Sequence, residues 1–419
     1  MFSTIFNNLL GIEYVVTKDD TSAHIGYSRD ENANTIIPHG LLSETGLDFI
    51  INQSIKFENW DDIPAFFRTG TGNLPFDIFA ATFYLLSRYE EYGGFTPDHH
   101  NRFPASESVL YQNKILDKPL INLWALQLQE ILKKTDTILV FKPRKFQYIS
   151  TIDVDQMWKY KNKGFLRSII GNVRDLYAKK WENFLERWPV LFGFRDDPFF
   201  NFDWQKALHL EFNTKTIYFL LLGNRSKFDK NIPHSNIAQQ RAIQQLANSD
   251  NVDIGIHPSY HSNLSNELVS KEIKRLKDVT GDDVTISRQH FLMHQMPTTF
   301  HNLIANGITE EHTLGYSTDL GFRAGIACPF QFYDIGKEKI TNLTLYPFCV
   351  MDITAPHYYG LKPDQAIARI NDLMTSVYNV GGLFISLWHN ESLSETERWK
   401  GWRVVYKKMV EKAAELSSK

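Results

Sequence analysis

From residue 146 to the C-terminus, short apolar segments typical of strands alternate with longer segments of helical periodicity, and this alternation constrains the fold most. Neighbouring parallel strands need long crossover connections, usually helices, so the pattern predicts a parallel sheet covered by helices. About seven strands fit either a barrel or a doubly wound sheet. We predict strands at 146–151, 216–222, 252–256, 284–288, 313–316, 343–348 and 383–388, and helices at 237–247, 266–279, 364–378 and 395–415.

The first third of the chain has a mixed pattern. Its apolar segment 76–92 carries hydrophobic residues at helical spacing, which predicts a helix buried on one face. A second helix is expected at 122–133, followed by a hinge at 142–144. A chain of 419 residues is long for one domain. We therefore expect an N-terminal α/β accessory domain at 1–145 and a main domain at 146–419.

Two acidic residues end the first strand of the main domain. Asp153 and Asp155 close the segment FQYISTIDVD, and alternate residues of a strand point to the same face, so both carboxylates can converge. The expected strand 252–256 is followed by HPSYH, in which His257 and His261 share a face if the chain turns helically. One carboxylate and two imidazoles can hold Zn²⁺ with an open fourth position, and the second carboxylate is left as a base. The pattern predicts metal-assisted hydrolysis.

The composition excludes other classes of protein. A hydrophobic content of 43% supports large cores, and a net charge of -3 argues against a nucleic-acid partner held by bulk electrostatics. Cys328 and Cys349 are the only cysteines, so disulfides are not the stabilising device. The N-terminal segment lacks the basic region and apolar core of a signal peptide, and we expect a cytoplasmic protein.

Five segments resemble the motifs of the polysaccharide deacetylase superfamily (carbohydrate esterase family 4), in the order typical of that family. The resemblance implies a distorted (β/α)7-type barrel from about residue 146 to the C-terminus, preceded by the accessory domain. The five are the pair Asp153/Asp155, the pair His257/His261, Arg323 in GFRAGIACPF, Asp352 in YPFCVMD, and Leu387-Trp388-His389.

The resemblance also implies a metal site and its chemistry. Asp155, His257 and His261 would bind a divalent metal ion, for which Zn²⁺ is the first choice and Co²⁺, Ni²⁺ or Mn²⁺ are alternatives. The expected reaction is removal of an N-acetyl or O-acetyl group from a sugar or from a precursor of an envelope polysaccharide. The expected partner is therefore an acetylated sugar or glycan.

The acid and base groups follow from the same motifs. Asp153 would take a proton from water as the general base, and Arg323 would keep it ionised. His389 would protonate the leaving amine as the general acid. Asp352 would orient His389 and raise its pKa.

Three more residues are candidates for the sugar site. Arg288 and His290 lie on one face at the end of an expected strand, where they either line the sugar site or form a structural salt bridge. Trp388 either provides an apolar wall for the acetyl methyl group or fills the core. Two other functions remain open. One is a non-catalytic barrel that binds glycan or scaffolds polysaccharide assembly, and the other is an amidohydrolase acting on another C–N bond.

A long insertion at about 158–200 follows the first strand of the main domain. Its apolar residues, among them Phe165, Ile169 and Val173, can form a helical stripe flanked by the many lysines and arginines of 159–180. A basic amphipathic helix can lie on an anionic membrane, here the inner face of the cytoplasmic membrane, or it can pack on its own protein with a solvated basic face. Peripheral membrane contact is therefore one of two expectations for this segment.

Overall fold

The computed structural model describes residues 1–18, 23–29, 34–45, 55–142 and 144–419, so Pro143 of the expected hinge lies outside the described residues. The chain divides into two compact units. Unit 1 comprises Met1–Gln147, Thr313–Cys349 and Asp372–Phe384, and unit 2 comprises Tyr148–His312, Val350–Asn371 and Ile385–Lys419. The expected domain boundary at 145/146 remains a prediction.

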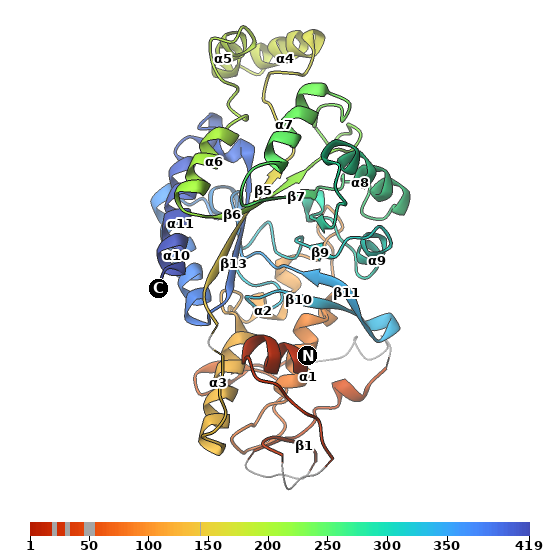
Figure 1. Cartoon of the computed structure of the whole chain (residues 1–419), viewed down its shortest axis with the longest axis vertical. Coiled ribbons are helices and arrows are strands. Elements are labelled where there is room, and N and C mark those ends of the chain that lie inside the picture. Colours follow the sequence, from red (N-terminus) through yellow and green to blue (C-terminus); the bar gives the residue numbers. More distant parts are fainter. Residues whose placement is uncertain (19–22, 30–33, 46–54, 143) are drawn as a thin grey trace. The chain divides into compact units, whose positions relative to one another are not determined.

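A parallel sheet forms the centre of unit 2 (Figure 1). Its strands lie in the order β9-β8-β7-β6-β5-β13-β12, and the pairs with a resolved register are parallel, as the alternation of segments predicts. In sequence order the strands are β5 (Gln147–Val154), β6 (Lys215–Leu220), β7 (Val252–Ile256), β8 (Ile286–Ser287), β9 (Glu310–Glu311), β12 (Val350–Met351) and β13 (Leu383–His389).

Two of the expected strands differ from the structure. Residues 313–316 form no strand, although most of their side chains are buried, and the strand before them is the short β9. The segment 343–348 overlaps β11 (Lys339–Leu345), which pairs antiparallel with β10 (Phe330–Asp334) in unit 1. Both expectations came from the apolar composition of the segments, which indicates burial. A buried apolar segment, however, need not adopt strand geometry or pair with a parallel neighbour.

Helices connect the strands of unit 2, and short polar residues begin several of them. Asn236 accepts a hydrogen bond from the Gln239 backbone N–H at the start of α7, and Ser265 does the same for Leu268 at the start of α8. Such side chains satisfy the free N–H groups of a first helical turn. The helices here are α6 (Phe202–Glu211), α7 (Ile237–Ala247), α8 (Asn266–Thr280), α9 (Thr298–Ala305) and α11 (Trp402–Ser417), while α10 (Pro363–Asn379) has residues in both units.

One face of the sheet is joined to α6 and α11 through a buried tyrosine. The Tyr406 hydroxyl of α11 lies 2.6 Å from Ser150 Oγ of β5 and 2.5 Å from His209 Nε2 of α6. The ring of Tyr406 packs edge-on against Trp388 of β13, with ring centroids 5.0 Å apart. In Figure 1, α6 and α11 lie on the same side of β5 and β13, in agreement with these contacts.

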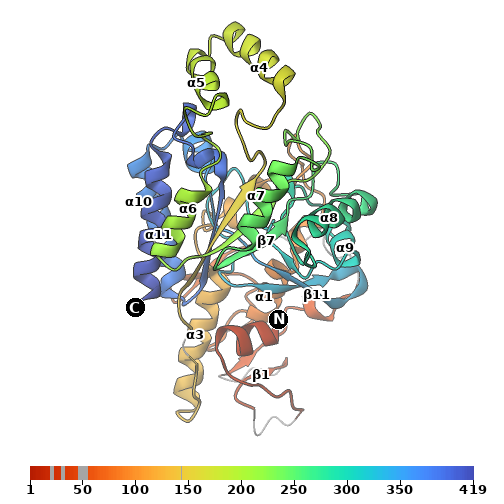
Figure 2. The same ribbon diagram turned by 45° about the horizontal axis from the view of Figure 1, so that its top comes forward.

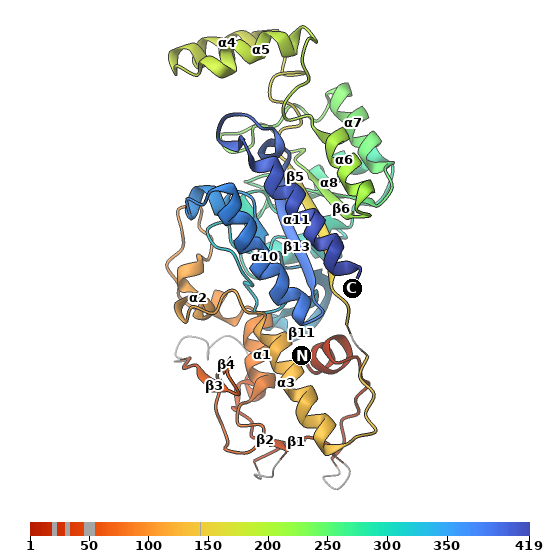
Figure 3. The same cartoon turned by 90° about the vertical axis from the view of Figure 1, so that its left-hand side faces the viewer.

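The insertion after β5 folds into a helical hairpin of α4 (Phe165–Tyr177) and α5 (Trp181–Leu191). In Figures 1, 2 and 3 this pair extends beyond the sheet, and α5 contacts the segment 397–400 of unit 2 through Asn183 and Glu182. Both ends of the insertion are held at one point, because Asn390 Nδ2 donates to the carbonyls of Gln156 and Phe199, each at 2.9 Å. The hairpin therefore leaves and rejoins unit 2 beside the end of β13.

In its described residues, unit 1 combines helices with three small pairs of strands. Its helices are α1 (Ile78–Leu86), α2 (Val109–Gln112) and α3 (Leu120–Thr135); α1 overlaps the expected segment 76–92, and α3 overlaps the expected segment 122–133. Besides β10 and β11, it contains the pairs β1 (Gly26–Tyr27) with β2 (Thr35–Ile36), and β3 (Glu58–Trp60) with β4 (Ile63–Ala65). Within the described parts of the chain, no helix has the length and apolar character needed to cross a bilayer.

Candidate metal centre and catalytic groups

The candidate site lies at the carboxyl edge of the unit 2 sheet. Asp153 is near the end of β5 and Asp155 follows it, while His257 follows β7 directly. Beyond the end of β8 the chain continues into Arg288 and His290. Because parallel strands end at the same edge, residues far apart in sequence meet there, and open α/β sheets and barrels build their sites at this edge.

Three side chains present metal-ligating atoms to a common point. Asp155, His257 and His290 each offer one ligand atom, and these atoms lie within 4.8 Å of one another. His257 Nε2 is 3.3 Å from Asp155 Oδ1, and His290 Nε2 is 3.4 Å from Asp155 Oδ2. Both histidines are buried, at 1% and 4% exposure, whereas Asp155 is half-buried. One oxygen and two nitrogens are a ligand set for Zn²⁺ or a related divalent ion.

Two atoms of this group lack the hydrogen bonds that burial normally requires. His257 Nε2 and Asp155 Oδ1 are buried and have no hydrogen-bond partner among the residues that the structure describes. Buried polar atoms are nearly always satisfied, and leaving one unsatisfied costs about 1–3 kcal/mol. These two atoms face each other, so a single cation between them would satisfy both. The residues therefore fit a divalent metal ion.

The surroundings of His257 leave the correct nitrogen free. His257 Nδ1 lies 2.6 Å from the backbone carbonyl of Arg288, which can only accept a hydrogen bond. Nδ1 therefore carries the proton, and the lone pair of Nε2 points toward Asp155. Metal-ligating histidines commonly donate their other N–H group in this way, which fixes the tautomer and the ring orientation.

A carboxylate orients the second histidine. His290 Nδ1 lies 2.9 Å from Asp229 Oδ1, on the side of the ring opposite Nε2. The Asp229 carboxylate is itself held by the Tyr260 backbone N–H at 2.9 Å and by the Ser226 hydroxyl at 2.6 Å. A carboxylate behind a ligating histidine increases its basicity and fixes its position.

The electrostatics of the group favour a positive charge. Burial lowers the pKa of His290, but Asp155 and Asp229 outweigh it and raise that pKa to about 9. Burial would raise the pKa of Asp155, but His290, His257 and His389 hold it well below its usual range. A carboxylate that stays ionised between imidazoles is ready to bind a cation.

His261 lies elsewhere, which corrects the expected ligand set. Its side chain is exposed and packs near the rings of Tyr260 and Phe228, with centroids 5.1 and 6.2 Å away. Among the described residues, the ligand group includes His290 and does not include His261. The expectation required a helical turn after β7, but residues 257–259 have no helical structure, so residues four apart do not share a face.

The guanidinium beside Asp153 belongs to Arg288. Arg288 Nη1 donates to Asp153 Oδ1 at 3.0 Å and to Thr151 Oγ1 at 2.7 Å, while its Nε donates to the His312 carbonyl at 2.9 Å. Arg288 is fully buried over the ring of Phe219, with the guanidinium carbon 4.4 Å from the ring centroid. Of the two expectations for Arg288, the structure therefore contains the salt bridge, which is formed with Asp153.

Arg323, the arginine expected at Asp153, binds another carboxylate. Its Nε and Nη2 donate to the two oxygens of Glu91 at 2.9 and 2.8 Å, and its Nη1 donates to the Gly315 carbonyl at 3.0 Å. Arg88 also donates to Glu91, at 2.7 Å, and to the Arg323 carbonyl, at 2.6 Å. This buried network lies within unit 1, so Arg323 has a structural environment there.

His389 and Asp352 form a charged pair at the ends of β13 and β12. His389 Nδ1 lies 3.1 Å from both oxygens of Asp352, and Asp352 Oδ2 also accepts from the His389 backbone N–H at 2.7 Å. Burial lowers the pKa of His389, but Asp352 and the more distant Asp155 and Asp153 raise it to about 10. The other ring nitrogen, Nε2, lies 4.0 Å from Asp155 Oδ2 and therefore faces the candidate metal position.

Trp388 is fully buried against Tyr406 of α11, so core packing describes its position. Asp229 was not anticipated, because it lies in the connection after β6 and in no motif. Asp229 lies two residues before the buried Asn231, whose side chain donates to the Gly223 carbonyl. Nothing in this spacing marks Asp229 as a site residue in the sequence alone.

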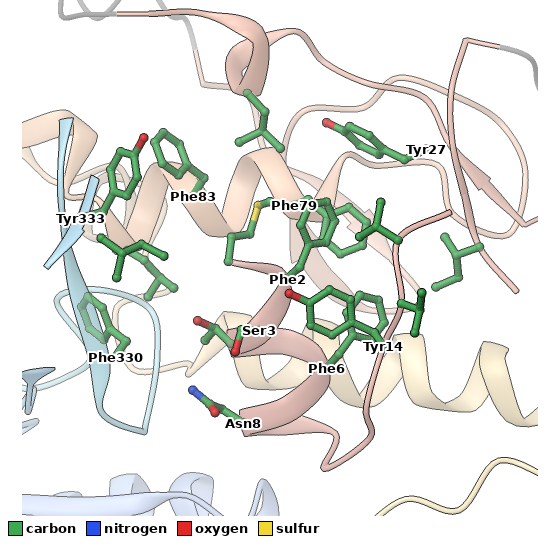
Figure 4. A pocket seen from close by; sticks show the side chains of 18 of the residues that line it. Phe2, Ser3, Phe6, Asn8, Tyr14, Tyr27, Phe79, Phe83, Phe330 and Tyr333 are labelled. Atoms are coloured by element: carbon green, nitrogen blue, oxygen red, sulfur yellow. The ribbon is translucent and has the colours of Figure 1, made fainter. Parts of the chain in front are cut away.

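A large pocket lies in unit 1, and its lining residues are separate from these site residues. Its volume is about 1520 Å³, and aromatic side chains such as Phe2, Phe6, Phe79 and Tyr333 line it (Figure 4). None of the metal-ligating or acid–base candidates is among its lining residues. The site is therefore identified by its ligand atoms and not by cavity size.

Comparisons with known proteins give a partial picture. A model described as a family of unknown function (DUF7033) matches residues 1–137. No curated protein matches the chain. Among solved structures, a protein from Mycobacterium smegmatis provisionally described as a polysaccharide deacetylase is 15% identical, with a TM-score of 0.42, over 65% of this chain and 85% of that one.

Two Bacillus structures are also similar. A CE4 family pseudoenzyme from Bacillus anthracis is 12% identical, with a TM-score of 0.31, over 64% of this chain and 62% of that one. A polysaccharide deacetylase from Bacillus cereus is 10% identical, with a TM-score of 0.29, over 64% of this chain and 87% of that one. At these values the functional argument rests on the site itself. The solved structures to which this chain is similar include members of the superfamily that its five motifs resemble.

Proposed function

We propose that this chain is a metal-dependent hydrolase that removes N-acetyl or O-acetyl groups from a sugar or from a precursor of an envelope polysaccharide. The observation that carries the proposal is the pair of buried, unsatisfied atoms His257 Nε2 and Asp155 Oδ1, which face each other beside His290 Nε2. A distorted seven-stranded barrel belongs to the same proposal; the number of strands in the unit 2 sheet supports it, and closure of that sheet is the proposed part.

Asp155, His257 and His290 would hold the cation. When bound, it supplies a Lewis acid that polarises a carbonyl group and lowers the pKa of water. The oxygen and two nitrogen ligands suit Zn²⁺, and Co²⁺, Ni²⁺ or Mn²⁺ suit the same set.

Asp153 is the proposed general base. Arg288 binds its Oδ1, and its Oδ2 lies 3.7 Å from His257 Nε2, so the second oxygen faces the group of ligand atoms. The Arg288 guanidinium offsets the negative charge of Asp153 and fixes its rotamer through the shared contact with Thr151. Proton removal from the attacking water is the role that fits this position.

His389 is the proposed general acid. Its pKa of about 10 keeps the imidazole protonated at neutral pH, and Asp352 occupies its Nδ1. Nε2 is therefore the nitrogen that can donate a proton to the leaving amine or alcohol. The side chain of His389 is 18% exposed, which allows a substrate to reach it.

Metal analysis combined with product analysis tests the proposal. We expect the purified full chain to bind one equivalent of a divalent metal ion, and to release acetate from N-acetylglucosamine oligosaccharides or from O-acetylated sugars. His290→Ala should lose both properties, and His261→Ala should keep both. Glycan binding without acetate release would favour a non-catalytic role, and hydrolysis of cyclic amides alone would favour the amidohydrolase alternative. The cytoplasmic location is part of the proposal and is tested by cell fractionation.

A further inference from the structure

The α4–α5 hairpin buries several polar residues and exposes most of its large apolar residues. Of the 25 large hydrophobic side chains that are exposed among the described residues, 11 lie between Phe165 and Phe194. In α4, Leu166, Ile170 and Val173 are 70, 60 and 50% exposed and lie on one stripe of the helix. A helix that packs on its own protein buries such a stripe, so this face is arranged for contact with something else.

The second helix repeats the arrangement. Trp181, Leu185 and Phe192 of this segment are 56, 67 and 68% exposed and follow helical spacing. Its buried positions include Asn183 and Arg187, at 7 and 6% exposure. The outward apolar face is therefore shared by both helices.

A polar interior holds the two helices in this orientation. Arg187 of α5 forms a buried ion pair with Asp175 of α4, and its guanidinium lies against Gly171, where an added Cβ would come within 2.8 Å of Nη1. Asn183 accepts from Lys159 at 2.9 Å and donates to Glu397 at 2.6 Å. Turning one helix over while the other stayed in place would break these contacts and leave Asp175 or Arg187 buried without its partner, which is costly. The outward apolar face is thus a stable feature of the hairpin.

The charges around the apolar face are mainly positive. Each of the three carboxylates of the helices, Asp175, Glu182 and Glu186, is engaged in an ion pair with a cation. Among the residues that the structure describes, Arg167 and Lys179 have no carboxylate within ion-pair distance. The exposed Arg174 and Lys180 form ion pairs with Asp175 and Glu397 at the longer distances of 3.6 and 3.5 Å. The charges beside the apolar face that have no carboxylate partner, Arg167 and Lys179, are therefore cationic.

We propose that the α4–α5 hairpin docks on an anionic lipid surface, with its apolar face inserted among the headgroups and acyl chains and its cations on the lipid phosphates. Apolar helical faces bordered by lysine and arginine bind such interfaces, and tryptophan and tyrosine, here Trp181 and Tyr177, favour the headgroup level. Charge complementarity distinguishes this occupant from an apolar protein surface, which would leave Arg167 and Lys179 without a partner of opposite charge. The hairpin follows β5 after the connection 155–164, so docking would bring the carboxyl edge of the sheet toward the lipid (Figure 1).

Co-sedimentation of the full chain with vesicles tests the proposal. We expect binding to vesicles of phosphatidylglycerol and phosphatidylcholine in equal amounts, weaker binding to phosphatidylcholine alone, and a fall in binding as salt screens the charges. The variant Arg174→Gln/Lys179→Gln/Lys180→Gln should bind the anionic vesicles on the order of 100-fold more weakly. Replacing Lys206, Lys407 and Lys408, exposed lysines elsewhere in unit 2, should have little effect.

An apolar variant provides the second arm. Leu166→Gln/Ile170→Gln/Val173→Gln should reduce vesicle binding about tenfold or more. The matched control replaces Leu210, Ile237 and Leu264 by Gln. These side chains lie outside the hairpin and are 51, 64 and 50% exposed, so the control should bind like the wild type. The proposal is overturned if the wild type does not bind anionic vesicles at low salt, or if the apolar variant binds as well as its control. Loss of a dimer in the apolar variant, without any vesicle binding by the wild type, would assign the face to a second copy of the chain.

Discussion

Replacing Asp229 by Asn isolates the contribution of the carboxylate behind His290. Asn has the same shape, and its Oδ1 can still accept from His290 Nδ1 and from the Tyr260 N–H, which both bind Asp229 Oδ1 at 2.9 Å. Its amide nitrogen would face the Ser226 hydroxyl, which now donates to Asp229 and already accepts from the Phe228 and Asp229 backbone N–H groups, so the Ser226 contact would be lost. The change therefore removes a negative charge and leaves the two contacts to Oδ1 in place.

We expect metal affinity to fall 10- to 100-fold, or about 1.4 to 2.7 kcal/mol, the usual effect of losing the partner of a ligating histidine. Competition between the protein and a chelating dye measures this affinity, and the unfolding temperature in chelator checks that the apo protein still folds. His261→Ala is the matched control and should bind metal normally. An unchanged affinity in Asp229→Asn, or an equal loss in His261→Ala, would refute the assignment of His290 as a ligand.

Three further outcomes are expected. Asp153→Asn should retain the metal but lose roughly 10²- to 10⁴-fold in turnover, because it removes the proposed base and no ligand. Loss of the metal in this variant would mean that Asp153 is the ligand and Asp155 the base. His389→Gln should lower kcat by a similar factor for amide substrates and much less for esters with good leaving groups, which need little protonation; equal losses would remove His389 from the acid role. Burial lowers the pKa of His209 from 6.5 to about 4. Protons therefore bind the unfolded chain first as the pH falls below 6.5, so stability should drop by about 3 kcal/mol toward pH 4, and urea unfolding of His209→Gln should show a flatter dependence on pH.

Local periodicity predicted the regular elements of unit 2 well. The limits expected for the strand at 252–256 and the helix at 237–247 are those of β7 and α7. Both segments have apolar spacing that matches their own geometry, and Asn236 gives α7 a polar start. The segment 313–316 failed because its burial comes from tertiary contacts without a strand partner, which a single sequence does not reveal.

The candidate site was predictable where it depended on strand ends and unpredictable where it depended on loops. Asp155, His257 and His290 all follow strands, so their meeting at one edge could be expected from a parallel sheet. The choice between His261 and His290 depended on whether the chain turns helically after β7, and sequence spacing alone does not decide this. Asp229 reaches His290 from an irregular connection, and such long-range contacts carry no periodic signal.

Asn390, one residue beyond the proposed acid His389, fixes both ends of the insertion independently of what lies between them. Its single amide group holds the carbonyls at both ends of the insertion, and the rings of Trp158 and Phe200 stack there with centroids 5.2 Å apart. Between two fixed ends, each doubling in the length of a flexible loop costs only about 0.6 kcal/mol. Helices can therefore be lengthened, shortened or exchanged between these ends while β5 and β13 keep their positions. Related chains can change what the hairpin touches without changing the residues that would perform the reaction.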